Sequence, residues 1–427
     1  MLIGTRNTME PKIAVIGLGY VGLPLAVALA KTHVVVGYDT SEQRVRELKE
    51  AHDRTREVDE SILKNTKLQV STDPSSMLGA DIFIVTVPTP VSAGNLPDLE
   101  PLRKASEVIG ELIGKGSVIV YESTVYPGVT EDFCGPILEK ISGLKSGVDF
   151  FLGYSPERIN PGDKIHTVDK ITKVVSAQTP IVSQKLAQIY GQINNNNIFV
   201  AKSIKAAEAA KVIENTQRDI NIAFMNEISL IFSKMNISIY DVLEAASTKW
   251  NFLKFTPGLV GGHCIGVDPY YLAQASKNLG YDPQMILAGR SINEAMPNEL
   301  ADLMTQRVGR SLRLLILGLT FKENVPDLRN TKVTSLIEAL RKRGHQVDVH
   351  DPCADPKEAN QFFGYDLVPV LTLDDPYDGV VGAVPHTLYC QFSTADFSRF
   401  LKPQGWVFDL KAIWRSSPPA GFNYWTL

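Results

Sequence analysis

The residues best suited to chemistry lie in a glycine-rich stretch, residues 257–272, which reads PGLVGGHCIGVDPYYL. Two adjacent glycines stand just before Cys264 and remove side-chain bulk beside its sulfur, so a ligand can approach the thiol closely. Asp268 follows four positions later, and Pro269 suits the first turn of a helix. A thiol near a helix N-terminus, with a cation nearby, gains thiolate character. The stretch therefore predicts a nucleophilic cysteine.

The alternative for Cys264 is the role of a small buried apolar side chain, which is the common fate of a single cysteine. We expect Cys264 to be the one cysteine in an exposed loop. The other three, Cys134, Cys353 and Cys390, are far apart and form no C-x-x-C pair. A metal site or a disulfide framework is therefore not expected, and the cysteine usage fits a reducing compartment, the cytoplasm.

The length and composition are those of a globular chain with more than one core. At 427 residues it is long enough for two or three domains. It is 44% hydrophobic and 21% charged, with a net charge of −4. This balance gives no reason to expect nucleic acid or an anionic membrane as a partner.

One segment imitates an export signal or a membrane span. Residues 13–30 carry no charge, follow basic residues and end in the small-residue run AVALA. Three glycines and Pro24 interrupt the run, however, and a second strand-like run follows at once. We expect a strand and a helix of a globular domain here instead.

A dinucleotide-binding pattern occupies this same segment. Residues 17–22 read Gly-Leu-Gly-Tyr-Val-Gly and lie between a strand-like run, 12–16, and a helical one. The next strand-like run, 33–38, ends at Asp39. Glycines at this spacing allow a tight turn and let backbone N–H groups reach a pyrophosphate at the helix N-terminus. Asp39 can bind both ribose hydroxyls and would repel a 2′-phosphate, so the pattern predicts NAD rather than NADP.

Further strand-like runs alternate with helical ones, which indicates a parallel α/β sheet. Ligands of open α/β sheets bind at the carboxyl ends of the strands. Those ends carry three proline-containing loops, VPTP, ESTVYPG and YSPERINPG, although such turns also occur without function. The runs are residues 81–87, 117–122, 150–154, 173–176 and 198–200.

A long helix is predicted over residues 203–235, which contain neither proline nor glycine. Such a helix is typical of a spine between domains or a dimer interface. Glu208, Lys211 and Asn215 share one of its faces, being spaced i, i+3 and i+7. A Glu–Lys pair at this spacing is also typical of a solvated helix surface. Two further helices are expected over residues 239–247 and about 283–306.

A second α/β array begins at residue 313, with strand-like runs at 314–317, 346–350, 379–384 and 406–410. It lacks the full glycine triplet and so need not bind a dinucleotide. Lys322 and Arg329 follow its first strand and suit a phosphate group, the alternative being a solvated basic loop. We therefore expect an α/β fold of two Rossmann-like domains joined by a long central helix and a helical dimerisation region. The expected boundaries are 1–202, 203–306 and 307–427.

Several long motifs occur together in one order: VYESTVYPG, GYSPERINPGD, AAKVIENTQRD, KWNFLKF and GLVGGHCIGVDPYYL. In these the chain resembles the UDP-glucose/UDP-hexosaminuronate dehydrogenase family, and most of all its Vi-polysaccharide and O-antigen type UDP-N-acetylhexosamine 6-dehydrogenases. The resemblance implies oxidation of the sugar C6 alcohol to a carboxylate with two NAD molecules, through a cysteine thiohemiacetal and thioester. UDP-N-acetyl-D-glucosamine is the expected substrate and a surface polysaccharide, such as a capsule or O-antigen, the expected end product.

Other functions stay open. The same chemistry could act on UDP-GalNAc, then UDP-ManNAc or UDP-glucose, because sequence alone does not resolve the C4 epimers. A two-electron hydroxyacid dehydrogenase would share the first domain and the spine but would need no cysteine. A nucleotide-sugar-binding module without catalysis would be expected to have lost some of the reactive residues.

The resemblance also implies roles for particular residues. Cys264 is the expected nucleophile, Lys211 and Asn215 stabilise oxyanions, and Asp268 helps order the water and proton relay. The residues expected to position and activate water are Thr124 and Glu157. Those expected to hold NAD are Gly17, Gly19, Gly22, Asp39, Arg44, Thr89, Ser123, Thr124 and Arg329. Those expected to contact the UDP-sugar are Glu157, Arg158, Lys211, Asn215, Arg218, Phe252, Leu253, Gly258, Gly261, His263, Phe321 and Lys322.

The chain departs from the glucose-type pattern at a few of these positions. Arg158-Ile159-Asn160-Pro161 stands where that type has Phe-Leu-Ala-Glu, and His263 stands where it has serine. Arg158, Arg218 and His263 are therefore candidates for contacting a 2-acetamido group, His263 being equally suited to a structural hydrogen bond. No metal is expected, and the expected assembly is a homodimer or higher homo-oligomer in the cytoplasm, formed through residues 203–235.

Overall fold

The computed structural model describes residues 10–92, 94–158, 169–262, 265–371 and 375–427. The chain separates into two compact units. The first contains the chain up to residue 214 together with residues 270–280, and the second contains residues 215–269 and 281–427. Each unit is described by itself, and the three-domain boundaries stay a prediction.

The first unit is built on an eight-stranded sheet of order β3-β2-β1-β4-β5-β6-β7-β8. Neighbouring strands are parallel except β6 and β7, which run antiparallel. The strands are β1 (Ile13–Ile16), β2 (Val35–Tyr38), β3 (Gln69–Ser71), β4 (Ile82–Val85), β5 (Val118–Tyr121), β6 (Phe151–Tyr154), β7 (Lys173–Ala177) and β8 (Ile198–Val200). The order 3-2-1-4-5-6 within it is that of the dinucleotide-binding fold.

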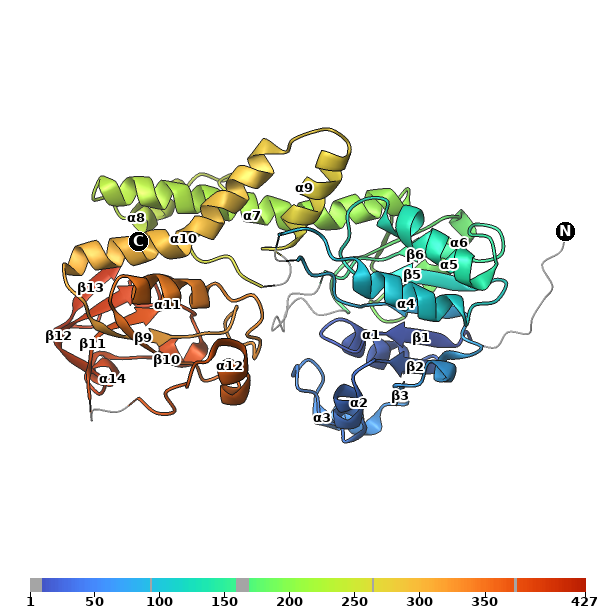
Figure 1. Cartoon of the computed structure of the whole chain (residues 1–427), viewed down its shortest axis with the longest axis horizontal. Coiled ribbons are helices and arrows are strands. Elements are labelled where there is room, and N and C mark those ends of the chain that lie inside the picture. The colour runs from blue at the N-terminus through green and yellow to red at the C-terminus, as the bar shows by residue number, and fades with distance from the viewer. Residues whose placement is uncertain (1–9, 93, 159–168, 263–264, 372–374) are drawn as a thin grey trace. The chain divides into compact units, whose positions relative to one another are not determined.

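Helices cover both faces of this sheet, so its central strands are apolar at every position. Ile13 and Val15 of β1 pack toward α1 and α6, whereas Ala14 and Ile16 pack toward α4 and α5. Figure 1 shows α4 and α5 side by side across one face. The helices are α1 (Gly22–Leu29), α2 (Glu42–Lys49), α3 (Glu60–Asn65), α4 (Glu100–Gly110), α5 (Gly135–Ser142) and α6 (Pro180–Gly191).

The uncharged run at residues 13–30 forms β1, an interior strand of this sheet, and α1, which packs on it. The export-signal alternative is therefore wrong: the run is apolar because it is buried on both sides. Within the described residues, no helix combines the length and the apolar character needed to cross a bilayer.

The long helix α7 (Ile204–Lys234) forms as predicted, and the boundary between the two units falls inside it. Within the second unit, α7 is tied to α10 (Gln284–Val308) by buried polar contacts: Asp219 Oδ1 lies 2.6 Å from an Arg290 nitrogen and accepts from Asn293 Nδ2 at 2.8 Å. The other helices of this region are α8 (Ile239–Ala246) and α9 (Asp268–Asn278).

The second unit contains a five-stranded parallel sheet of order β10-β9-β11-β12-β13. Helices α10 and α11 pack on one face and α13 and α14 on the other; α10, α11 and α14 are labelled in Figure 1. The elements are β9 (Arg313–Leu317), β10 (Gln346–His350), β11 (Tyr377–Gly382), β12 (Leu401–Asp409), β13 (Asn423–Thr426), α11 (Val333–Lys342), α12 (Pro356–Phe363), α13 (Thr387–Cys390) and α14 (Thr394–Phe397). The edge strands β3 and β13 were not predicted, because their sequences, QVS and NYWT, include polar residues and form no continuous apolar run.

Candidate active site

The three glycines after β1 each meet a different steric demand. Gly17 has φ +93°, a left-handed conformation that favours glycine. A Cβ on Gly22 would collide with the Gly17 carbonyl and the Thr86 hydroxyl, which itself donates to Gly17 O at 2.7 Å. A Cβ on Gly19 would meet nothing within 4 Å, so this glycine borders open space. One glycine makes the turn, one allows close packing, and one leaves room for a ligand.

Asp39 closes the glycine turn from the end of β2. Its Oδ2 accepts the Leu18 N–H at 2.8 Å, and its Oδ1 accepts the Ser41 N–H at 2.9 Å. Arg44 lies behind it: the guanidinium donates to the Leu18 carbonyl at 2.8 Å and pairs with Asp53 at 2.8 Å. Arg44 is 5% exposed, so in this structure its guanidinium stabilises the glycine turn from the protein interior.

These residues fit NAD. Gly19 leaves space where a pyrophosphate approaches the start of α1, and the half-buried Asp39 carboxylate lies where the adenosine ribose hydroxyls bind in this fold. When bound there, NAD supplies a hydride acceptor.

The remaining predicted cofactor residues of this unit follow β4 and β5, which are neighbours in the sheet. Ser123 is buried, and its hydroxyl donates to the Val87 carbonyl at 2.6 Å, which joins the two strand ends. Thr89 and Thr124 are half-buried beside them. The topology thus gathers the predicted loops at one edge of the sheet.

Glu157, after β6, belongs to a buried charge network. Lys173 Nζ lies 2.9 Å from Glu157 Oε2 and 2.7 Å from Glu122 Oε2, and the Tyr190 hydroxyl donates to the other Glu122 oxygen. Burial raises the pKa of Glu122, although Lys173 opposes it. Burial alone would lower the pKa of Lys173, but Glu122 and Glu157 raise it. Lys173 therefore stays charged between the two carboxyl groups.

The face of α7 in the first unit is buried, so the solvated-surface interpretation is wrong. Glu208 is 0% exposed and accepts the N–H groups of Gly128 and Thr130 at 2.6 and 2.9 Å. Lys211 is 8% exposed. Arg158 is exposed and pairs with Glu214 at 2.7 Å.

In the second unit, Asn215 and Asp268 form a direct contact. Asn215 Nδ2 lies 2.5 Å from Asp268 Oδ2, and the two residues are 6% and 2% exposed. Asp268 is the first residue of α9, where the helix dipole favours a negative charge. Asn215, predicted to stabilise an oxyanion, and Asp268, predicted to act in the proton relay, are thus hydrogen-bonded to each other.

The glycine-rich stretch is held by side chains that the sequence did not single out. Asn226 of α7 accepts the Gly258 N–H at 2.7 Å and donates to the Gly258 carbonyl at 3.1 Å. A Cβ on Gly258 would collide with the Lys411 ammonium. Desolvation lowers the pKa of Lys411, which follows β12 and lies beside this backbone.

The same stretch lies against the predicted UDP-sugar segment of the second array. A Cβ on Gly262 would stand 2.7 Å from the Phe321 ring, and a Cβ on Gly261 would stand 2.6 Å from the Asn330 carbonyl. Lys322 is half-buried. Arg329 is exposed, with its guanidinium 2.8 Å from Asp327. The structure thus brings the glycines and Phe321 together.

The other predicted residues are less enclosed. Phe252 is half-buried against the core of the second unit, Leu253 is 57% exposed, and Arg218 is exposed. His263 and Cys264 lie outside the described residues. Cys390 is exposed as well, but it lies on α13 and not in a loop, so the expectation that Cys264 is the one cysteine in an exposed loop stays a prediction.

Sequence reasoning missed Lys173, Glu122, Asn226 and Lys411. Lys411 carried a usable signal, since it follows the expected strand at residues 406–410, where ligands of such sheets bind. Lys173 and Glu122 stood within or beside apolar strands, where a charged residue signals a buried partner. Asn226 carried no signal that distinguishes it from a surface residue.

A glycine turn of this geometry, followed by an acidic residue at the end of the next strand, is typical of an NAD-dependent oxidoreductase. Comparison with known proteins agrees along the chain. Residues 11–194, 205–295 and 315–416 match the NAD binding, central and UDP binding domains of the UDP-glucose/GDP-mannose dehydrogenase family. The chain belongs to this family, and it is an NAD-dependent nucleotide-sugar dehydrogenase.

Individual relatives span nearly the whole chain. Protein CapL of Staphylococcus aureus is 52% identical over 95% of this chain and 96% of its own. The UDP-N-acetyl-D-glucosamine 6-dehydrogenase of Pseudomonas aeruginosa is 48% identical over 94% and 97%. A UDP-N-acetyl-D-mannosamine dehydrogenase of Pyrococcus horikoshii is 33% identical over 80% and 83%. A solved structure of the Pyrococcus UDP-D-ManNAc dehydrogenase superposes with a TM-score of 0.87, covering 97% of this chain and 98% of that one at 29% identity.

Proposed function

We propose that this enzyme oxidises C6 of UDP-N-acetyl-D-glucosamine to the carboxylate, yielding UDP-N-acetyl-D-glucosaminuronate for a surface polysaccharide. The observation that carries the choice of sugar is the near-complete match to the Pseudomonas UDP-N-acetyl-D-glucosamine 6-dehydrogenase, against a lower identity to the mannosamine enzyme. The same chemistry on UDP-N-acetylgalactosamine is the second candidate, because the two sugars differ only in the direction of one hydroxyl.

The first oxidation removes a hydride from C6 and a proton from its hydroxyl. A developing oxyanion is stabilised by nearby donors in a site that excludes water. Lys211 and Asn215 supply an ammonium and an amide for this purpose, both buried on α7. Asp268, which lies against the Asn215 amide, orients it and takes part in the proton relay.

The aldehyde is then held on the enzyme. The Cys264 thiol adds to the carbonyl carbon to give a thiohemiacetal, and loss of a second hydride gives a thioester. Water hydrolyses this thioester, which returns the thiol and releases the carboxylate. Glu157 positions the water together with Thr124, and the Lys173 ammonium holds the Glu157 carboxyl group at 2.9 Å.

The nucleotide is held by the second unit. Lys322 and Lys411 supply two cations that suit a diphosphate, and the Phe321 ring packs against the glycine-rich stretch. Gly258 and Gly261 leave no room for side chains, which keeps this backbone close to its neighbours. Phe252, Leu253, Arg158, Arg218 and His263 remain the proposed contacts to the sugar and its acetamido group, and Thr89, Ser123, Arg44 and Arg329 the further contacts to NAD.

The enzyme is proposed to act as a homodimer through α7. Phe224 and Ile231 lie on one face of this helix, seven residues apart, and they are 53% and 49% exposed; Met235, directly after the helix, is 58% exposed. A row of large apolar side chains in water is typical of a surface that another chain covers. The cytoplasm is the proposed compartment, which the three free thiols of the described cysteines support.

The test is a stoichiometry. Purified enzyme is given NAD with each of four UDP-sugars (GlcNAc, GalNAc, ManNAc and glucose), and NADH and uronate are measured. We expect about two NADH per sugar consumed, with UDP-GlcNAc giving the highest kcat/KM. About one NADH per sugar would indicate a two-electron dehydrogenase, and none a binding module.

Two cysteine variants complete the test. Cys264→Ala is expected to abolish uronate formation, whereas the matched variant Cys390→Ala, which changes an exposed thiol, is expected to retain it. Full turnover by Cys264→Ala would refute the covalent route.

A further inference from the structure

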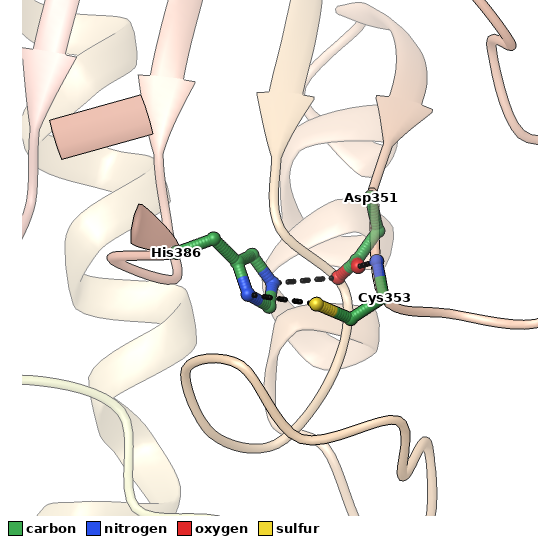
Figure 2. A group of neighbouring side chains, drawn as sticks. All are labelled: Asp351, Cys353 and His386. Carbon is green, nitrogen blue, oxygen red and sulfur yellow. Dashed lines mark hydrogen bonds and ion pairs between the residues drawn. The ribbon is translucent and has the colours of Figure 1, made fainter. Parts of the chain in front are cut away.

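A thiol, an imidazole and a carboxylate meet at the carboxyl end of the second sheet (Figure 2). Asp351 follows β10, Cys353 lies two residues later, and His386 precedes α13. The Cys353 sulfur lies 3.5 Å from His386 Nδ1, and His386 Nε2 lies 3.1 Å from Asp351 Oδ2. His386 is 1% and Asp351 7% exposed, while Cys353 is half-buried.

The proton on the imidazole is located by a backbone amide. The Asn324 N–H points at His386 Nδ1 from 2.9 Å, and a backbone N–H can only donate. Nδ1 therefore carries a lone pair, and Nε2 carries the proton that it donates to Asp351. The thiol of Cys353 thus faces the basic nitrogen of the ring and shares it with the Asn324 N–H.

The carboxylate is held in its charged form. Asp351 Oδ2 accepts the N–H groups of Leu319 and Thr320 at 2.6 and 2.9 Å, besides the imidazole. Burial alone would raise the pKa of Asp351, but the hydrogen bonds from His386 and from these amides lower it. An ionised carboxylate behind an imidazole increases the basicity of the opposite nitrogen, as in thiol and serine enzymes whose base is oriented by a third group.

We propose that Cys353 is a nucleophilic thiol, activated by His386 and Asp351, and a site of oxidation by hydroperoxides in the UDP-binding part of this enzyme. It is distinct in sequence and role from Cys264. Cys390 and Cys134, by contrast, are an exposed thiol that contacts the Pro385 carbonyl at 3.6 Å and a fully buried one.

The reaction is a two-electron oxidation of sulfur. The sulfur attacks one peroxide oxygen, the O–O bond breaks, and an S–O bond forms. His386 takes the thiol proton and passes it to the departing hydroxide. The products are a cysteine sulfenic acid and water, or an alcohol when the oxidant is an organic hydroperoxide.

Oxidation at this position acts on the turn after β9. Asp351 accepts from Leu319 and Thr320, and His386 accepts from Asn324, so the three groups hold the backbone on both sides of Phe321 and Lys322. A sulfenic oxygen on Cys353 would compete with the Asn324 N–H for Nδ1 and displace this turn. The expected consequence, which rests on the proposed function, is weaker binding of the nucleotide-sugar.

A metal ion fits this cluster less well. The carboxylate faces Nε2 and the thiol faces Nδ1, and a metal ion uses one ring nitrogen. The three side chains therefore form a relay and do not converge on one point.

The first experiment compares thiols within one molecule. Native enzyme is treated briefly with iodoacetamide, and peptide mass spectrometry follows the alkylation of each cysteine. Exposure alone would make Cys390 react faster than the half-buried Cys353. We expect the opposite, with Cys353 faster by about tenfold or more because of the general base. A Cys390 rate equal to or above that of Cys353 overturns the proposal, and no variant is needed for this comparison.

A variant then tests the base. His386→Gln keeps a polar side chain of similar length and removes the imidazole, so we expect the Cys353 rate to fall to that of an ordinary thiol while the Cys390 rate is unchanged. An unchanged Cys353 rate in a folded His386→Gln enzyme contradicts the relay. Protection of wild-type Cys353 by micromolar Zn²⁺ would show a metal site in its place.

The second experiment separates this site from the proposed function. In a Cys264→Ser background, UDP binding is measured by calorimetry before and after hydrogen peroxide, and a dimedone adduct reports sulfenic acid. We expect a several-fold weaker affinity after oxidation, and no change when Cys353→Ser is added. A Cys353 adduct with unchanged affinity overturns the coupling to the turn, whereas no UDP binding before treatment contradicts the proposed function alone.

Discussion

We expect replacement of the buried Lys173 to lower the stability of the first unit strongly, although only one charge is removed. It lies between Glu122 and Glu157 at 2.7 and 2.9 Å, and the three are 4%, 2% and 7% exposed. Replacing Lys173 by Met keeps the length of the side chain but leaves two buried carboxyl groups without a cation. Removing one partner of a buried ion pair costs about 3–5 kcal/mol.

Lys64→Met is the matched control in the same unit. Lys64 pairs with Glu60 at 2.5 Å, but the two side chains are 61% and 67% exposed. Exposed pairs of this kind contribute little to stability, because water screens the two charges. Hydrogen exchange of peptides covering β5, β6 and β7 is the assay, because it reports the opening free energy locally. Lys173→Met should accelerate exchange there roughly a hundredfold to several thousandfold, and Lys64→Met less than about tenfold.

The pH dependence has a definite sign. Burial raises the pKa of Glu122 above its ordinary value of 4.5. Between the unfolded-state pKa and this higher native-state pKa, the native state binds more protons than the unfolded state, so stability falls as pH rises through that range. Lys173 opposes this rise, so without Lys173 the pKa of Glu122 goes up further and the pH range over which stability falls extends to higher pH. The cost of Lys173→Met should therefore be smaller near pH 5 than near pH 8.

A second substitution tests whether charge is the cause. Glu122→Gln added to Lys173→Met removes one uncompensated carboxylate, so the double variant should exchange more slowly than Lys173→Met at pH 8. Equal exchange by the single and double variants, or by Lys173→Met and Lys64→Met, would refute the buried-charge explanation.

Three further perturbations test other parts of the molecule. Asp39→Asn weakens an acceptor of ribose hydroxyls and removes the charge that repels a 2′-phosphate. The KM for NAD should rise by about tenfold and use of NADP should increase in steady-state assays. An unchanged ratio of kcat/KM for NAD to kcat/KM for NADP would contradict this. Glu208→Gln leaves one oxygen to accept two backbone N–H groups. It should therefore lower the free energy of unfolding by about 1–3 kcal/mol, measured in urea titrations. An unchanged free energy of unfolding would show that the carboxylate is dispensable. Asn226→Ala removes both hydrogen bonds to Gly258. It should lower kcat for the UDP-sugar while the Kd for NAD stays unchanged. A loss of NAD binding as well would indicate general unfolding.

Much of the fold could be predicted from the sequence because its signals are local. The strand at residues 12–16, the glycine triplet and the acid at the end of the next strand follow one another within thirty positions or so, and each has a steric or polar reason that neighbours alone supply. The long helix was equally readable, since no proline or glycine interrupts it. The motif order also carried the family, which the comparison confirmed.

The sequence could not decide which polar side chains are buried in the folded protein. Glu208 and Lys211 have the spacing of a surface pair, and only the packing of α7 on the first unit buries them. Lys173 meets Glu122 across 51 positions, and Asp351 meets His386 across 35. The sequence by itself determined most of the strands, the glycine turn and the chemical types at the strand ends. The tertiary structure decided which charges face each other, because burial and pairing depend on chain segments that no local pattern connects.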